Sequence, residues 1–256
     1  MQVIVLPDAD AVGTYAGDLI ADRAEAGTLK VLGVATGSSP LPVYESLERR
    51  ASPAVRRLTA FALDEYVGLP TEHPESYHAV IDREVTELLG LDPARVHVPD
   101  GLADDIEAAA AAYERAIVDA GGVDLQILGI GSTGHIGFNE PTSSFASRTR
   151  IKTLTPETRR DNARFFPSLD DVPLHCVTQG LGTIMDARSV LLVAFGAGKA
   201  DAVAAAVEGP LTSMCPGSIL QMHPDATVLV DEAAAARLTL RDYYDFVFAH
   251  RPAWQR

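Results

Sequence analysis

The residues best suited to chemistry lie in one segment, residues 124–141 (DLQILGIGSTGHIGFNEP). An apolar run breaks into glycines and then presents His135, Asn139 and Glu140 within a few residues. His135 is the only side chain there that can shuttle a proton near neutral pH, and Glu140 could hold its ring in one orientation. A lone histidine after a glycine turn is more often structural than catalytic, so both interpretations stay open on this motif alone.

A second loop, residues 61–70 (FALDEYVGLP), is predicted to place two carboxylates at the end of another apolar strand. One of the two carboxylates, Asp64 or Glu65, could act as a general base if partial burial raised its pKa toward the working pH. The alternative is a pair of solvated loop acids or a helix cap.

A third loop, residues 35–40 (ATGSSP), has the composition of an anion site. Gly37 lets the backbone approach a ligand, Ser38 and Ser39 offer hydroxyl donors, and Pro40 can begin a helix whose N–H groups and dipole favour phosphate. The loop matches neither a Walker motif nor a dinucleotide fingerprint, so it implies no nucleotide. The alternative is an ordinary helix-capping turn.

Two basic residues could complete a phosphate site in this acidic chain. Lys199 follows FGAG and begins a helical segment, and Arg164 ends the segment RRDNAR. Arginine can bind a phosphate in bidentate fashion and lysine as a point charge, although most such residues are solvated helix cations. The residues therefore predict a small phosphorylated substrate with one acid/base histidine and one carboxylate, and no cofactor or metal-ligand motif. They do not name the reaction.

These loops must be positioned by regular elements, which the hydrophobic periodicity predicts. The expected strands are residues 2–6, 30–35, 58–63, 96–98, 123–130, 189–195 and 227–230, and the expected helices are 9–26, 41–50, 74–89, 104–120, 156–165 and 199–207. Such alternation predicts an α/β, Rossmann-like fold: one doubly wound domain over residues 1–256, with a mainly parallel sheet and helices on both faces. Residues 150–154 (RIKTL) could add a peripheral hairpin strand, and the aromatic tail, 242–256, is expected to dock.

Composition limits the partners. The 256 residues contain 21 Lys and Arg against 35 Asp and Glu, a formal net charge of −14, which disfavours nucleic acid and anionic membranes. No run approaches the roughly 20 apolar residues of a membrane span, and the start lacks the features of a signal peptide, so a cytoplasmic location is expected. Cys176 and Cys215 have no metal-type spacing and fit two buried thiols of a reduced compartment.

Several longer motifs resemble the glucosamine-6-phosphate deaminase family. They are residues 64–69 (DEYVGL) with 73–77 (HPESY), then 134–141 (GHIGFNEP), then 147–154 (SRTRIKTL), in family order with the glycine-serine loop, residues 207–209 (VEG) and residues 220–224 (LQMHP). The resemblance runs from the first strand to about residue 231. It implies conversion of glucosamine 6-phosphate and water into fructose 6-phosphate and ammonium, without a cofactor.

The resemblance also implies roles for single residues. His135 matches the residue that opens the sugar ring, Asp64 the base that moves a proton between C2 and C1, and Glu140 the carboxylate that orients the histidine. Gly37, Ser38, Ser39, Arg164 and Lys199 match the phosphate site.

One position departs from the family pattern. Two residues before the histidine the family often has Asp, and sometimes Asn, where this chain has Thr133. A hydroxyl can form hydrogen bonds but cannot stabilise an imidazolium as a carboxylate would. The hypothesis is an active but slower enzyme in which Glu140 alone supplies the negative charge and ring opening is weakened more than isomerisation. A drift to another sugar phosphate is a further alternative.

Some family members are hexamers activated by N-acetylglucosamine 6-phosphate bound between subunits. Ser143, Arg150, Lys152 and Thr153 match that site, so the resemblance implies a homo-oligomer and an allosteric site. The alternative is a retained subunit contact without a ligand.

Two other functions compete. A phosphogluconolactonase-like hydrolase shares the general fold and a glycine-histidine loop, but DEYVGL favours the deaminase. A non-catalytic sugar-phosphate sensor that regulates transcription would carry a DNA-binding helix-turn-helix and a basic patch, which this acidic chain does not suggest.

Overall fold

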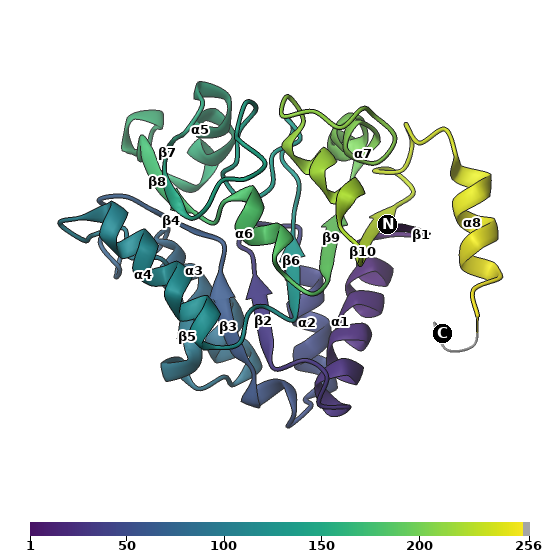
Figure 1. Cartoon of the computed structure of the whole chain (residues 1–256), viewed down its shortest axis with the longest axis horizontal. Coiled ribbons are helices and arrows are strands. Elements are labelled where there is room, and N and C mark those ends of the chain that lie inside the picture. Colours follow the sequence, from purple (N-terminus) through teal and green to yellow (C-terminus); the bar gives the residue numbers. More distant parts are fainter. Residues whose placement is uncertain (253–256) are drawn as a thin grey trace.

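The computed structural model describes residues 1–252 and contains two sheets (Figure 1). The larger sheet has seven strands in the order β1-β10-β9-β6-β2-β3-β5, and every neighbouring pair is parallel. Its strands are β1 (Gln2–Leu6), β2 (Val31–Val34), β3 (Thr59–Ala62), β5 (Val96–His97), β6 (Leu125–Leu128), β9 (Val190–Ala194) and β10 (Ala226–Asp231). All seven predicted strands are therefore present.

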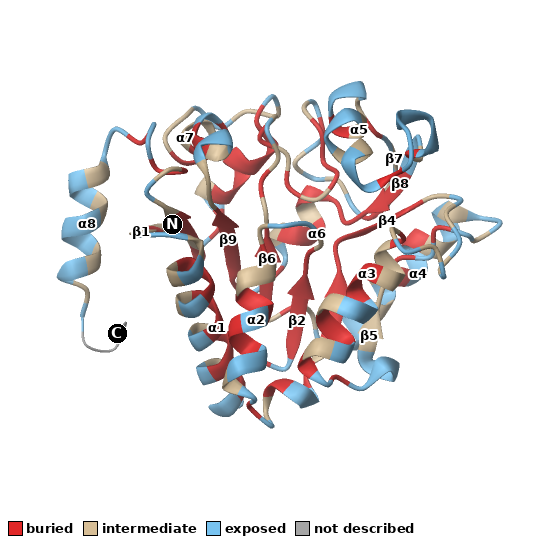
Figure 2. Ribbon diagram, turned by 180° about the vertical axis from the view of Figure 1, so that it is seen from behind, coloured by how far each residue is buried: buried red, intermediate tan, exposed pale blue. Residues whose placement is uncertain are grey.

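The parallel arrangement fits central strands that are buried along their whole length and, apart from Gln126, apolar. Every residue of β2 (VLGV), β6 (LQIL) and β9 (VLLVA) is buried, and Figure 2 shows the same strands as a continuous buried layer. Strands covered on both faces lack the in-out alternation of a half-exposed antiparallel sheet. Helices must then cover both faces.

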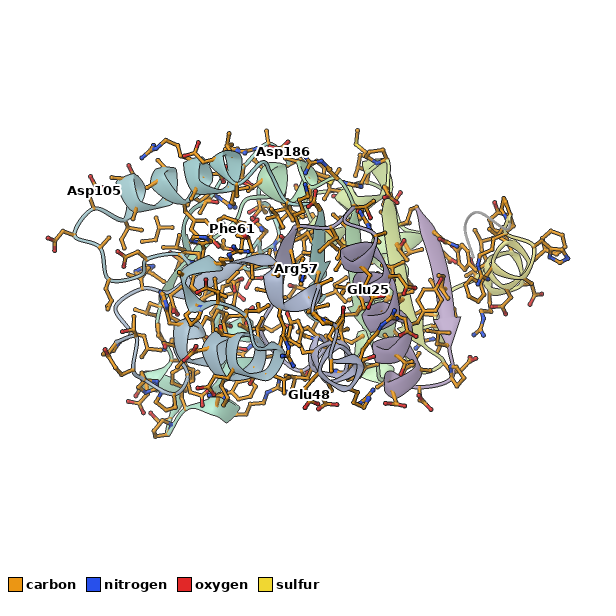
Figure 3. The ribbon with its side chains drawn as sticks, turned by 90° about the horizontal axis from the view of Figure 1, so that it is seen from below. Glu25, Glu48, Arg57, Phe61, Asp105 and Asp186 are labelled. Carbon is orange, nitrogen blue, oxygen red and sulfur yellow. The ribbon has the colours of Figure 1, made fainter. Side chains whose placement is uncertain are left out.

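The helices form a layer on each side of the sheet. Two large hydrophobic clusters occupy the two faces, one involving α1, α2 and the α3 region and the other α4, α6 and α7. Figure 3 shows the separation from below, with Asp105 before α4 and Asp186 after α6 on one side and Glu48 of α2 on the other. The helices are α1 (Ala9–Glu25), α2 (Leu41–Arg50), α3 (Tyr77–Ile81), which continues as a π-helix (Asp82–Glu87), α4 (Ile106–Asp119), α5 (Pro156–Asn162), α6 (Leu181–Met185), α7 (Ala200–Val207) and α8 (Arg241–Ala249). The predicted doubly wound α/β fold is confirmed.

Local sequence accounts for where the first helix begins and what it buries. The Asp8 carboxylate accepts the N–H of Ala11 at 2.8 Å and so caps α1. Val12, Ala16 and Ile20 recur at every fourth position and are buried, which places one apolar stripe against the sheet.

The smaller sheet is antiparallel and lies above the carboxyl ends of the large one in Figure 1. It pairs β4 (Asp64–Tyr66) with β8 (His175–Thr178) and β8 with β7 (Arg150–Thr153). The strand predicted at residues 150–154 is confirmed, whereas β8 was not predicted. The prediction that Asp64 and Glu65 lie in a loop is wrong: both belong to β4, because the chain pairs with β8 as soon as it leaves β3.

The C-terminal part adds elements that periodicity did not predict. Helix α6 is too short for a clear pattern. Helix α8 lies beside the edge strand β1. Its Phe248 ring packs edge-on against the Tyr15 ring of α1, with ring centroids 5.9 Å apart. The predicted docking of residues 242–256 is met for this helix, while residues 253–256 lie outside the described part.

The structure of residues 1–252 also bears on the cysteines and on the possibility of a membrane span. Both cysteines, Cys176 and Cys215, are free and buried, as expected. Within these residues no helix is long and apolar enough to cross a membrane.

Candidate active site

A cavity of about 590 Å³ opens at the carboxyl ends of the central strands. This is the edge where a parallel α/β sheet places its ligands, because neighbouring crossovers diverge there and leave a crevice. The predicted residues that line it are Gly37, Ser38, Ser39, Asp64, His135, Arg164 and Lys199. The fold therefore brings together side chains from β4, from the loops after β2, β6 and β9, and from the segment after α5.

Thr133 and Glu140 lie behind His135 rather than on the cavity wall. The His135 Nδ1 atom is 2.8 Å from the Thr133 hydroxyl and 3.4 Å from Glu140 Oε2. The Thr133 hydroxyl also donates to Glu140 Oε2 at 3.4 Å. The predicted contact between histidine and carboxylate is present, and the Thr133 hydroxyl lies beside both groups.

Glu140 is held as an anion. Its burial alone would raise the pKa, but the hydrogen bond and charge of His135, with hydrogen bonds from Thr158 and Thr155, outweigh that effect and lower the pKa to about 2. A carboxylate that stays ionised at neutral pH is suited to orienting and stabilising an imidazolium.

Glycines make room for the histidine loop. A Cβ atom at Gly131 would lie 2.1 Å from His135 Cε1, so the ring lies directly over this residue. At Gly137, where φ is +54°, a Cβ atom would lie 3.6 Å from Asp64 Oδ2. Any larger residue at Gly131 would therefore displace the ring, and Gly137 brings the loop close to the second acid/base residue.

Asp64 has the opposite electrostatic environment. Its side chain is only 5% exposed. Burial, and then the charge of Glu65, raise the pKa of Asp64 to about 8, although hydrogen bonds from the Phe138 N–H and the Thr178 hydroxyl oppose the shift. A carboxylate with a pKa near the working pH can accept a proton and return it.

Glu65 points away from the reacting groups and organises the backbone. Its carboxylate accepts the N–H groups of Tyr66 at 2.7 Å, Tyr77 at 2.9 Å and His78 at 2.8 Å. Burial raises the pKa of Glu65 despite these three hydrogen bonds. Of the two acids that sequence left as alternatives, only Asp64 lines the cavity.

The other end of the cavity is suited to an anion. The N–H groups of Gly37, Ser38 and Ser39 donate to no acceptor within residues 1–252, and they precede α2, whose dipole favours negative charge. Lys199 Nζ donates to the Ile130 carbonyl at 2.7 Å, which aims the ammonium at the loop after β6. Burial lowers the pKa of Lys199 and the nearby charge of Arg164 adds to that effect, although Asp161 opposes it. A bound phosphate dianion would offset the burial of the Lys199 ammonium.

Sequence reasoning missed several residues around the site. Tyr66, Tyr77 and Asn162 line the cavity, and the Asn162 side chain donates to the Tyr66 hydroxyl at 2.9 Å. Thr155 and Thr158 both donate to Glu140 Oε1. A threonine near the start of a helix normally indicates a helix cap, so nothing in the sequence indicated that these two threonines also bind Glu140. Asn139, which sequence placed among the candidates, is fully buried and donates to the Ile136 and Gln179 carbonyls.

The four residues matched to an allosteric site lie apart from this cavity. Arg150, Lys152 and Thr153 are on β7, and none of them lines the cavity. Ser143 is 3% exposed, and its hydroxyl has no hydrogen-bond partner among the described residues. Burial lowers the pKa of Arg150, which donates only to the Arg148 carbonyl, at 3.3 Å, within residues 1–252.

Comparisons with known proteins agree with this geometry. The family model described as glucosamine-6-phosphate isomerases/6-phosphogluconolactonase matches residues 7–229. A glucosamine-6-phosphate deaminase of Pseudarthrobacter chlorophenolicus is 59% identical over 100% of this chain and 99% of its own length. One from Streptomyces coelicolor is 57% identical over 100% of this chain and 99% of its own length.

Two solved structures from comparisons by fold are also similar to this chain. A monomeric glucosamine-6-phosphate deaminase superposes with a TM-score of 0.89 at 39% identity, covering 93% of this chain and 100% of that one. A 6-phosphogluconolactonase from Trypanosoma cruzi superposes with a TM-score of 0.75 at 20% identity, covering 93% of this chain and 97% of that one, and shows the shared fold. The chain belongs to the family of glucosamine-6-phosphate isomerases and 6-phosphogluconolactonases.

Proposed function

We propose that the protein converts glucosamine 6-phosphate and water into fructose 6-phosphate and ammonium. The observation that carries this function is one cavity that holds an oriented histidine, a buried carboxylate with a raised pKa and an anion-binding loop. The relatives named glucosamine-6-phosphate deaminase match the whole chain at up to 59% identity.

The phosphate would fix the substrate at one end. The free N–H groups of residues 37–39, with the Ser38 and Ser39 hydroxyls, would bind the phosphate oxygens, and Arg164 and Lys199 would balance the charge. The phosphate is on C6, so this contact holds C1 and C2 toward the acid/base groups.

His135 would open the ring. Its imidazole moves a proton from the C1 hydroxyl to the ring oxygen, so that the C1–O5 bond breaks and C1 becomes an aldehyde. Glu140, ionised behind the ring, stabilises the positive charge that the imidazole carries between the two transfers.

Asp64 would then isomerise the open chain. Its carboxylate takes the proton from C2 while the substrate's own ammonium group gives a proton to the C1 oxygen, which forms an enolamine. The protonated Asp64 then returns its proton to C1, and an iminium group remains at C2. Water adds to the iminium carbon at C2 and ammonia leaves, which becomes ammonium in solution. One base over the C1–C2 edge suffices for both proton transfers.

Direct assay of ammonium release from glucosamine 6-phosphate tests this function. We expect release in equal amount with fructose 6-phosphate, and its loss in His135→Gln and Asp64→Asn. Hydrolysis of 6-phosphogluconolactone without ammonium release would support the lactonase alternative instead. Tight sugar-phosphate binding with no turnover would support a sensor. The buried Asp64 favours the deaminase because lactone hydrolysis needs no proton transfer between two carbons.

We also propose that the substrate class places the enzyme in the cytoplasm and that the chain self-associates and is regulated. Helix α8 supports self-association, because Tyr243 and Phe246 are each 61% exposed. The unpaired Ser143 hydroxyl and the partly buried Arg150 support an anion site on the β7 side.

Two measurements test these proposals. Sedimentation should give a mass above one chain, up to a hexamer, and a monomer would contradict self-association. N-acetylglucosamine 6-phosphate should relieve sigmoidal kinetics in the wild type and not in Arg150→Ala. Hyperbolic kinetics that ignore the compound would contradict regulation at this site.

A further inference from the structure

The carboxylate behind His135 is itself held by hydroxyl groups from two segments of the chain. We define the threonine cluster as Thr133, which precedes His135, and Thr155 and Thr158 at the start of α5; all three donate to Glu140. We propose that Thr158 is a positioning residue for ring opening, and that the cluster transmits the orientation of Glu140 to His135. This inference rests on the proposed function.

Thr158 makes the shortest contact with Glu140. Its hydroxyl donates to Oε1, and Thr158 and Glu140 are each 3% exposed. Thr155 donates to the same oxygen at 3.2 Å while accepting the Thr158 N–H at 3.2 Å. Thr155 therefore caps α5 and joins that cap to the carboxylate, so the helix start and the Glu140 rotamer are fixed together.

The other carboxylate oxygen leads to the imidazole through Thr133. Ionised Glu140 can only accept hydrogen bonds, and the proposal assigns the one proton of the Thr133 hydroxyl to Oε2, 3.4 Å away. The lone pairs of that hydroxyl then accept from His135 Nδ1, 2.8 Å away. This direction of donation places the ring proton on Nδ1.

A proton on Nδ1 leaves a lone pair on Nε2. Within residues 1–252, His135 Nε2 makes no hydrogen bond, and the ring lines the cavity. The cluster therefore presents the basic nitrogen to the substrate. Without the Thr158 hydroxyl, Glu140 Oε1 would lose its closest donor inside a buried site and keep only Thr155, so the carboxylate would be held less firmly against the ring.

The test compares Thr158→Val with Thr183→Val. Thr183 offers a matched control, because the residue is 7% exposed and its hydroxyl donates to the Glu114 carboxylate at 2.5 Å, outside the cavity lining. We expect Thr158→Val to lower kcat about tenfold with little change in KM, since removing a buried hydrogen bond is worth about one power of ten. Thr183→Val should keep wild-type kcat.

A second readout follows the ring proton. Nitrogen-15 NMR distinguishes the two imidazole tautomers, and we expect the wild-type His135 signals to show Nδ1–H and those of Thr158→Val to show a mixture. Thr158→Ser keeps the hydroxyl and should restore both kcat and the tautomer, whereas Thr158→Ala should not. This Ser and Ala pair also decides the matter if the valine variant does not fold.

Equal kcat in Thr158→Val, Thr183→Val and wild type, or an unchanged tautomer in Thr158→Ala, would overturn the inference and leave the proposed function intact. Absence of ammonium release by the wild type would instead contradict the proposed function. In that case the NMR comparison still tests whether the cluster orients the ring.

Discussion

Two carboxylates of the site, Glu140 and Asp64, have similar burial and opposite proton affinities. Glu140 is 3% exposed and its pKa is lowered to about 2, whereas Asp64 is 5% exposed and its pKa is raised to about 8. Glu140 is surrounded by three threonine hydroxyls and His135. Asp64 has a carboxylate neighbour, Glu65, and fewer donors. Burial raises the pKa of both carboxylates, so the hydrogen-bond donors and charges beside them separate the two: His135 and the threonines lower the pKa of Glu140, whereas Glu65 adds to the effect of burial at Asp64.

The largest effect is expected from Asp64→Asn, which removes the base and keeps its shape. We expect kcat to fall about 10³-fold, within the range that general-base catalysis contributes. In the wild type, kcat/KM should rise with pH through about 8 as Asp64 ionises. A wild-type profile that is flat from pH 6 to 9 would contradict the raised pKa.

The same variant tests the energetics of Asp64. Its folded pKa, about 8, lies above its ordinary value of 3.8, so the folded protein keeps a proton that the unfolded chain loses. The free energy of unfolding should therefore fall as pH rises from about 4 to about 8, and the Asn variant should lose less over that range. Parallel unfolding curves for the two proteins would exclude this contribution.

Glu140→Gln should have the next largest effect. A neutral amide cannot stabilise the imidazolium, and its NH₂ group would face hydroxyls that now donate to a carboxylate. We expect kcat to fall about 10²-fold with little change in substrate affinity. Isomerisation should be spared, so deuterium exchange at C1 of fructose 6-phosphate with ammonium present should stay near wild type. An equal loss of exchange would mean that Glu140 serves both halves of the site.

Glu65→Gln should sharpen the contrast between Asp64 and Glu140, because it changes the charge beside Asp64 and leaves the Asp64 side chain itself intact. Removing the neighbouring charge lowers the pKa of Asp64, so the rising limb of kcat/KM should move to lower pH. The amide would also place a donor against one of the N–H groups of Tyr66, Tyr77 or His78, destabilising the fold by about 1–3 kcal/mol. A pH profile unchanged in position would show that burial alone sets the pKa of Asp64.

The smallest effect is expected at Thr133. Thr133→Asp adds a charge next to His135, but also places a second carboxylate where the hydroxyl is 3.4 Å from Glu140 Oε2. Mutual repulsion should limit the gain in turnover to about threefold. An unchanged rate would count against the hypothesis that a missing charge slows the enzyme, while Thr133→Val should be slower than wild type because it breaks the chain of hydrogen bonds.

Much of the architecture could be predicted because the central strands have a strong local signal. The runs that became β2, β6 and β9 are apolar apart from Gln126, and the polar residues after them mark the ligand edge. Strand β8 (HCVT) was missed because it is short and exists through pairing with β4 and β7, which are distant in sequence. Helix α6, with five residues, shows too little of a helical period to be recognised.

The candidate site likewise contains residues that the sequence motifs predicted and residues that only the folded structure brought to the site. The motifs around Asp64, His135 and Glu140 are visible in the sequence, and so is the glycine-serine loop. Thr158 was placed in a helix with no further role, because its partner Glu140 is 18 residues earlier and meets it only when α5 folds back over the histidine loop. The spacing of residues along the sequence does not show which side chains from separate segments will form a hydrogen bond in the folded protein.

The sequence by itself determined the residue types and the sheet edge at which they gather, because buried parallel strands bring their carboxyl ends together. Only the tertiary structure decided which carboxylate becomes an anion and which a base. That choice depends on burial and on the groups that each carboxylate meets in the folded chain. Glu140 meets His135, Thr158 and Thr155, which lower its pKa, whereas Asp64 is buried beside the charge of Glu65, which raises its pKa.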